Sequence, residues 1–252
     1  MMAEIRVEGG IKMAQSRTPD PQAPAHARLM QQQFGVLGGT FDPIHIGHLI
    51  VAQEAVSALH LDRLFFLPAG DPPHKHNREV TPAHHRVRMV ELAIADNPAF
   101  ELSLVDVERP GPSFTVDTLR LLRERWGPDT AISFIIGWDM LDDLSTWRDP
   151  VGVVRQVHRL VAVHRPGYEL SPQYLSRLEE MVPGINQRLA PLEAPQIAIS
   201  STELRRRVAS GRPIRYQVPD AVERYILAQG LYRQLPTEAQ GKCLPLPHPM
   251  PG

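Results

Sequence analysis

The chain has 252 residues, and 42% of them are hydrophobic, which is enough for the core of one large domain or two small ones. Lys and Arg number 27 against 28 Asp and Glu, so the basic excess that is typical of general nucleic-acid binders is missing, although a local basic patch at 203–208 stays possible. The single cysteine, Cys243, excludes a disulfide within the chain and favours a cytoplasmic protein. All apolar runs are short, so we expect no transmembrane helix.

Composition divides the chain into three parts. Residues 1–32 lack hydrophobic periodicity and contain the stretch RTPDPQAPAHAR, which predicts a disordered N-terminal extension. Residues 236–252 are rich in proline and predict a loose C-terminal tail. The sequence therefore predicts a single folded domain over 33–235, without internal repeats.

Strands and helices alternate along the first half of this domain. Short apolar runs predict strands, and apolar residues three or four positions apart predict helices. The expected elements are a strand at 34–37, a helix from Leu49 to about 59, a strand at 63–69, a helix at 81–97, a strand at 100–108 and a helix at 115–126. Thr81 is a candidate N-cap for its helix, with Pro82 in the first helical position.

The second half continues the alternation. It predicts a strand at 131–139, a short helix at 151–157, a strand at 159–166, a last strand at 195–200, a helix from about 201 and a closing helix at 220–232. Alternation of this kind indicates an α/β fold, a Rossmann-like doubly wound parallel sheet with helices on both faces. Such sheets bind ligands at the carboxyl ends of their strands, near the point where the strand order reverses.

The stretch GGTFDPIHIGH, residues 38–48, stands between the first strand and the first helix. Gly38 and Gly39 allow the backbone to approach a phosphate closely, and the following helix offers free N–H groups. His45 and His48 are three apart, so both imidazoles can point the same way and donate hydrogen bonds to a triphosphate. Asp42 is expected to fix the loop through local hydrogen bonds rather than to take part in chemistry.

A second polar block, ISSTELRRRV at 199–208, opens a later helix. Ser200 and Glu203 fit a capping box, which alone would explain both residues. Ser201, Thr202 and Arg205 add two hydroxyls and a guanidinium beside the same helix N-terminus. Phosphate binding is the natural use of that set.

Taken together, the two blocks resemble the signatures of the nucleotidyltransferases related to class I aminoacyl-tRNA synthetases, which share the His-x-Gly-His element. A lysine loop like that of the synthetases is not visible. The segments PAGDPPHKHNR, PSFTVDTL, FIIGWDML, STWRDP and HRPGY resemble those of bacterial nicotinate-nucleotide adenylyltransferases. The resemblance covers about 34–233 and implies the nucleotidyltransferase type of α/β fold.

The resemblance also implies roles for individual residues. It implies catalytic roles for His45, His48 and Arg205; ATP binding by Gly38, Gly39, Thr40, Phe41, Gly137, Asp139, Ser201 and Thr202; and mononucleotide binding by Lys75, Thr115 and Trp147, with the tryptophan stacked on the pyridine ring. Several of these have a structural explanation too. Trp147 could anchor its loop, Lys75 could be a solvated charge, and Thr115 and Asp139 could each cap a helix.

The implied reaction joins nicotinate mononucleotide to the adenylyl group of ATP, giving deamido-NAD and pyrophosphate in NAD biosynthesis. Mg²⁺ is expected to enter with ATP and to be held mainly by phosphate oxygens and water, without a protein ligand. No nucleic-acid or membrane partner is expected.

Three alternatives remain open. The first is the same chemistry on nicotinamide mononucleotide or phosphopantetheine, and the second is a non-catalytic nucleotide sensor on the same fold. The third is a zinc hydrolase built on the many histidines, which include His74, His76, His84 and His85 besides His45 and His48.

Overall fold

A computed structural model describes residues 32–70, 80–164, 170–195 and 197–233 of the chain. All of these belong to one of the two units into which the chain divides, residues 32–252. The predicted tail at 236–252 and all of the predicted extension except Gln32 lie outside the described residues. None of the described helices is both long and apolar enough to cross a bilayer.

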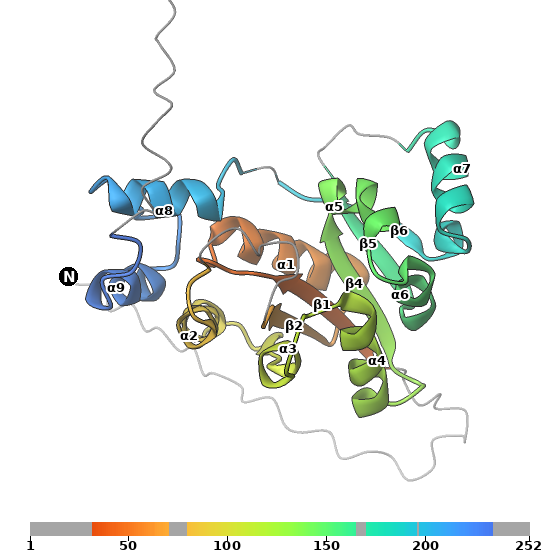
Figure 1. Cartoon of the computed structure of the whole chain (residues 1–252), viewed down its shortest axis with the longest axis horizontal. Coiled ribbons are helices and arrows are strands. Elements are labelled where there is room, and N and C mark those ends of the chain that lie inside the picture. The colour runs from red at the N-terminus through yellow and green to blue at the C-terminus, as the bar shows by residue number, and fades with distance from the viewer. Residues whose placement is uncertain (1–31, 71–79, 165–169, 196, 234–252) are drawn as a thin grey trace, which may run out of the picture. The chain divides into compact units, whose positions relative to one another are not determined.

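Strands and helices alternate throughout the described chain (Figure 1). The first half comprises β1 (Gln33–Gly39), α1 (Ile46–Leu59), β2 (Arg63–Pro68), α2 (Ala83–Ile94), β3 (Phe100–Leu102), α3 (Val105–Glu108) and α4 (Thr115–Trp126). The second half comprises β4 (Ala131–Gly137), α5 (Trp138–Asp142), the 3₁₀ helix η2 (Leu144–Thr146), α6 (Pro150–Gln156), β5 (Arg159–His164), α7 (Pro172–Met181), the 3₁₀ helix η3 (Ile185–Gln187), β6 (Leu189–Glu193), α8 (Ser201–Ala209) and α9 (Asp220–Ala228).

The strands form one parallel sheet in the order β3-β2-β1-β4-β5-β6. Figure 1 shows β2, β1, β4, β5 and β6 in succession across it. The central strand β1 pairs with β2 on one side and β4 on the other, so that Val36 lies between Phe65 and Phe134. The strand order therefore reverses between β1 and β4, and the predicted doubly wound sheet is confirmed.

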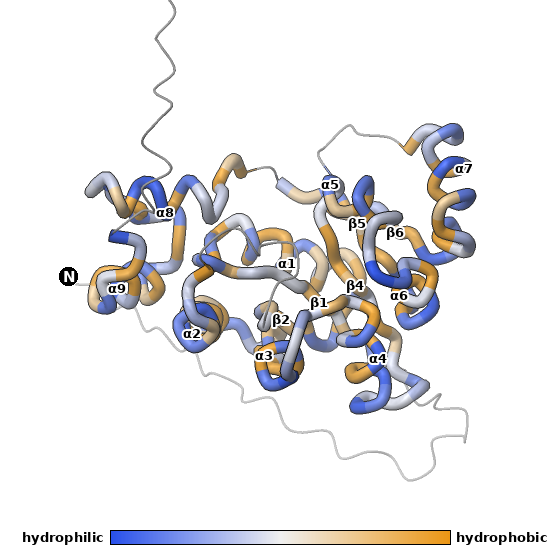
Figure 2. Tube along the Cα trace, viewed as in Figure 1, coloured by the Kyte–Doolittle hydropathy of each residue, from blue (hydrophilic) through white to orange (hydrophobic). Residues whose placement is uncertain are grey.

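Side chains that alternate along the strands form a core on each face of the sheet. Leu37, Ile135 and Val161 belong to a buried cluster with residues of α1, α2, α8 and α9. Val36 and Ala162 belong to a second cluster with residues of α4, α6 and α7. Figure 2 shows hydrophobic residues along β4 and β5, and mixed hydrophobic and hydrophilic residues on α4, α6 and α7. Each fully buried leucine or isoleucine stabilises the fold by about 1.5–3 kcal/mol, so the two clusters hold the strand ends in place.

The strand predicted at 100–108 is wrong except for its first three residues. β3 ends at Leu102, and α3 begins at Val105. Asp106 explains the change, because its buried carboxylate accepts a hydrogen bond from the Thr118 hydroxyl of α4. A buried carboxylate needs such a partner, and the turn into α3 provides it.

The predicted last strand at 195–200 is also wrong, because the sixth strand is Leu189–Glu193. β6 is short, lies at the edge of the sheet and contains Pro191, so its sequence is a weak strand signal. The apolar Ile197 of the predicted strand is instead 41% exposed and lines a cavity. The helix α7, Pro172–Met181, was not predicted.

Some predicted boundaries shift by a few residues. Pro82, and not Thr81, occupies the N-cap position of α2, since the N–H of His85 donates to the carbonyl of Pro82. The predicted strand at 131–139 ends at Gly137, where α5 begins, and the closing helix ends at Ala228.

Candidate functional site

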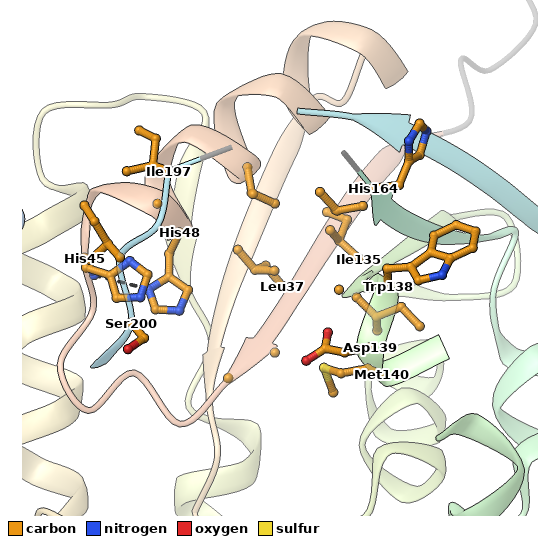
Figure 3. A pocket seen from close by; sticks show the side chains of 18 of the residues that line it. Leu37, His45, His48, Ile135, Trp138, Asp139, Met140, His164, Ile197 and Ser200 are labelled. Carbon is orange, nitrogen blue, oxygen red and sulfur yellow. Dashed lines mark hydrogen bonds between the residues drawn. The ribbon is translucent and has the colours of Figure 1, made fainter. Parts of the chain in front are cut away.

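A cavity of about 1020 Å³ lies at the carboxyl ends of β1 and β4, where the strand order reverses. Its wall is made by the ends of both strands and by the first turns of α1, α5 and α8. Figure 3 shows His45, His48 and Ser200 on one side, facing Asp139 and Met140 on the other. Ligands of doubly wound sheets bind in this kind of crevice, as the sequence predicted.

The two histidines are held together at the start of α1. His45 is the N-cap residue, and its ring stacks on that of His48 with 3.7 Å between the ring centroids. The backbone N–H of His45 donates to Nδ1 of His48 over 3.2 Å. Because Nδ1 accepts, a neutral His48 carries its proton on Nε2 and can donate that N–H to a ligand.

Both imidazoles are neutral near pH 7. Burial lowers the pKa of His45 to about 4. Burial, followed by the nearby charge of His45, lowers the pKa of His48 to about 3. A phosphate group beside the pair would favour the protonated forms, because an opposite charge at close range raises a histidine pKa.

The predicted glycines are placed for a close turn. A Cβ on Gly39 would lie 2.9 Å from the ring of Phe41, whose own φ is +50°. The Phe41 ring is 2% exposed and packs edge-on against His48, so its side chain supports the histidine from the core rather than lining the cavity. Gly38 lies on the cavity wall, and its Cβ position is free of backbone contacts.

The N-terminus of α8 closes one side of the cavity. The Ser200 hydroxyl accepts from the N–H of Glu203 over 3.2 Å, as the predicted cap requires, and Ser200 and Ser201 line the wall. The described part of the wall includes neither Thr202 nor Arg205. Those two are linked to each other, since Arg205 Nη2 donates to the Thr202 hydroxyl over 3.4 Å.

A second cavity, of about 480 Å³, adjoins the first. The two share Gly38, Gly39, Ile136, Asp139 and Met140. The second cavity is also lined by Thr40, Ser113, Thr115, Trp147 and Arg148. The structure therefore brings the predicted mononucleotide residues Thr115 and Trp147 together, next to the glycines.

The predicted residues of this second region lie on short elements. Thr115 is the first residue of α4, after the N-cap Phe114, so Thr115 is not itself a cap. Asp139 lies in the first turn of α5, which Gly137 caps. Trp147 contacts Phe134 with 6.4 Å between the ring centroids. Lys75 lies outside the described residues.

Asp42 makes long-range contacts instead of the predicted local ones. Its carboxylate accepts from the Thr81 N–H over 3.2 Å and from the Tyr232 hydroxyl over 2.7 Å. Its backbone carbonyl accepts from Arg205 Nη1 over 2.6 Å, which ties the loop to α8. Sequence reasoning missed Tyr232, because nothing in the local pattern links residues 190 positions apart.

Arg86 is a second residue that sequence reasoning missed. Its side chain is 1% exposed and donates to the carbonyls of Thr40, Gly70 and Thr81 over 2.9, 3.2 and 2.8 Å. A signal was present in the sequence, since Arg86 falls three residues before the buried Met89 on α2. A charged residue in a buried helical position indicates a specific partner.

Metal-binding groups are sparse in the described residues. These hold no group of three or more His, Cys, Asp or Glu side chains arranged for a metal ion. The rings of His84 and His85, on α2, lie with 4.1 Å between their centroids and an angle of 40° between their planes. His74 and His76 lie outside the described residues.

Comparison with known proteins identifies relatives of this chain. The model of the cytidylyltransferase-like family matches residues 36–207. A probable nicotinate-nucleotide adenylyltransferase of Roseiflexus sp. (strain RS-1) is 50% identical over 200 residues, which are 79% of this chain and 98% of the relative. One of Thermomicrobium roseum is 48% identical over 201 residues, or 80% of this chain and 92% of the relative.

Solved structures share the fold. Plasmodium falciparum nicotinic acid mononucleotide adenylyltransferase, solved in complex with APC and in complex with NaAD, superimposes with a TM-score of 0.63 in both cases. Each comparison covers 80% of this chain and 98% of the other, at 19% identity. At that identity, the likeness concerns the fold.

Proposed function

The chain belongs to the nicotinate-nucleotide adenylyltransferase family, and we propose that it transfers the adenylyl group of MgATP to nicotinate mononucleotide. The products are deamido-NAD and pyrophosphate, in NAD biosynthesis. One observation carries the proposal: two cavities meet at Gly38, Gly39 and Asp139. A reaction that joins two nucleotides needs two adjoining sites, with the reacting phosphates at their junction.

The larger cavity suits ATP. Its histidine pair and the N-terminus of α8 present N–H and hydroxyl donors, which a triphosphate requires. The carboxylate of Asp139 is an acceptor for ribose hydroxyls. The N–H groups at a helix N-terminus and the positive end of its dipole favour the negative phosphates on this side.

The smaller cavity suits the mononucleotide. Trp147 offers an aromatic face on which a pyridine ring can stack, and Thr115 offers a hydroxyl at the start of α4. The glycines at the junction leave room for the phosphate of the mononucleotide to approach that of ATP.

The chemistry needs no general base, because the nucleophile is a phosphate oxygen that is already anionic. That oxygen forms a bond to the α-phosphorus of ATP, and the bond from the α-phosphorus to the β-bridging oxygen breaks to release pyrophosphate. Catalysis then consists of positioning and charge stabilisation. His45 and His48 stabilise the α- and β-phosphates. Ser201 acts on the leaving end from the cavity wall, and Thr202 and Arg205 act on it from the same helix N-terminus, although their side chains lie outside the described wall.

Magnesium enters as part of the substrate, MgATP. Mg²⁺ prefers phosphate oxygens and water as ligands, so we assign it no protein ligand. When bound, the ion neutralises charge on the phosphates.

The test measures pyrophosphate release from MgATP with nicotinate mononucleotide and nicotinamide mononucleotide side by side. We expect the acid to be preferred by about tenfold or more in kcat/KM, as for a site built to recognise a polar group. Equal rates with the two mononucleotides, or a faster rate with the amide, would overturn nicotinate mononucleotide as the preferred acceptor. Adenylyl transfer as the type of reaction would still stand. ATP binding without pyrophosphate release from either mononucleotide or from phosphopantetheine would indicate a nucleotide sensor instead.

A further inference from the structure

Asp42 lies at the centre of a buried network that the proposed reaction does not explain. Its side chain is 4% exposed. The Tyr232 hydroxyl donates to Oδ1 over 2.7 Å, and the Thr81 N–H donates to Oδ2 over 3.2 Å. These donors come from the segment after α9 and the segment before α2, so the carboxylate joins two distant parts of the chain.

The backbone of the same loop holds α8. The carbonyl of Asp42 accepts from Arg205 Nη1 over 2.6 Å, and the carbonyl of Pro43 accepts from the Ser201 hydroxyl over 2.9 Å. Arg205 Nη1 also lies 4.0 Å from Oδ2 of Asp42. The position of this loop therefore sets where two of the predicted phosphate-binding residues of α8 stand.

The hydrogen bonds of the buried Arg86 go to backbone carbonyls and not to the Asp42 carboxylate. Its guanidinium lies close enough for the charge of Asp42 to act on it, but its donors go to the carbonyls of Thr40, Gly70 and Thr81. The Tyr232 hydroxyl is thus one of two hydrogen-bond donors to the Asp42 carboxylate among the described residues. A buried carboxylate that loses a donor bears the cost of desolvation, so the loop would shift to recover one.

The Tyr232 hydroxyl can donate its hydrogen bond to Asp42 throughout the working pH range. Burial, and then the negative charge of Asp42, raise the pKa of its phenol far above the ordinary value. The hydroxyl therefore keeps its proton at every pH at which the protein would be assayed.

We propose that Tyr232 is a positioning residue for Arg205, acting through Asp42. Its hydroxyl fixes the Asp42 carboxylate, and the Asp42 carbonyl in turn fixes the guanidinium that stabilises the departing pyrophosphate. This inference rests on the proposed function, in which Arg205 acts on the leaving group.

The test compares two half-buried tyrosines whose hydroxyls each contact another side chain: Tyr232, bonded to Asp42 and 3.9 Å from Met89 Sδ, and Tyr225, bonded to His85. Tyr232→Phe removes the bond to Asp42, whereas Tyr225→Phe removes the 2.8 Å bond to His85 Nδ1. We expect Tyr232→Phe to lower kcat about tenfold, the effect of one hydrogen bond to a charged group. The KM for nicotinate mononucleotide should change less than about twofold, since that ligand lies on the other side of the junction.

The control variant should keep its kcat within about twofold of the unsubstituted protein, because its hydrogen bond does not reach Asp42. Thermal unfolding of both variants shows whether they are equally folded. Equal kcat for the two variants would overturn the positioning role. Absence of pyrophosphate from the unsubstituted protein would instead overturn the proposed function.

A double-mutant cycle separates positioning from general packing. In the background of Arg205→Lys, Tyr232→Phe should lower kcat by less than about twofold more, because the group that it positions is already lost. Additive losses would overturn the proposal. If Tyr232→Phe does not fold, Tyr232→His replaces it in the same cycle, since it removes the phenol and leaves Asp42 and its backbone carbonyl in place.

Discussion

The two sides of the crevice are built differently. On the phosphate side, His45 is 8% exposed and stacked on His48, and Arg205 is bonded to the loop at Asp42. On the acceptor side, the wall comes from the start of α4 and from residues after η2, where Trp147 is half-buried and the Arg148 side chain is 60% exposed.

This difference separates two tasks of the proposed enzyme. Charge that develops in a transition state is stabilised best by donors that need no rearrangement, which the buried side supplies. Recognition of the acceptor ring depends on contacts made equally before and during the reaction, which the open side supplies. Substitutions on the phosphate side should therefore lower kcat, and those on the acceptor side should raise KM.

The largest effect is expected for His48→Ala. The loss of one donor held in place should lower kcat by about 10² or more. Steady-state pyrophosphate release checks this, with His60→Asn as a control because His60 is an exposed residue at the other end of α1. A near-normal kcat with only a raised KM would contradict the role of His48 and the comparison of the two sides.

The next effect concerns Trp147→Ala. Loss of a stacking platform should raise the KM for nicotinate mononucleotide by about tenfold or more, at about 1–3 kcal/mol per stacked ring. The KM for ATP should stay nearly unchanged. Trp126→Ala is the matched control, since Trp126 packs on Phe34 and Phe65 away from both cavities and should affect stability alone. Equal changes in both KM values for Trp147→Ala would count against the acceptor site.

The lowered pKa values of His45 and His48 predict how the free energy of unfolding depends on pH. Their pKa values fall from 6.5 in the unfolded chain to about 4 for His45 and about 3 for His48, so the unfolded state binds more protons in this range. The contribution of these two histidines to the free energy of unfolding is therefore fully present above pH 6.5. It is lost as the pH falls from 6.5 toward 4 and 3.

Urea unfolding at pH 7 and pH 5 measures that loss. Replacing His48 with Gln should make the loss between the two pH values smaller by about 1–2 kcal/mol. A loss of the same size in His48→Gln and in the unsubstituted protein would show that His48 is not neutralised by folding.

The smallest effect is expected for Asp139→Asn. An amide oxygen still accepts from ribose hydroxyls, but more weakly than a carboxylate, so the KM for ATP should rise about threefold to fivefold. Initial-rate measurements at varied ATP concentration check this. An effect on the mononucleotide alone would place Asp139 on the acceptor side of the junction.

The parallel sheet and the two polar sequence blocks, at 38–48 and 199–208, could be predicted because each depends on local sequence. The motif from Gly38 to His48 is continuous, and apolar spacing gave α1 and β4. The edge strand β6 could not be predicted, since an edge strand pairs on one side only and tolerates Pro191. The bond from Tyr232 to Asp42 was beyond sequence reasoning as well, because tertiary packing alone brings the two residues together.

The bond between Asp42 and Tyr232 also has a consequence for the order in which the protein is made. The residues of β1 and α1 leave the ribosome long before those of α9, and domains fold as the chain emerges. A partly synthesised chain that ends before Tyr232 can pair its strands, yet its Arg205 lacks the anchor that the tyrosine provides through Asp42. Under the role proposed for Tyr232, chains that terminate before this residue would be poor catalysts even if their sheet folds.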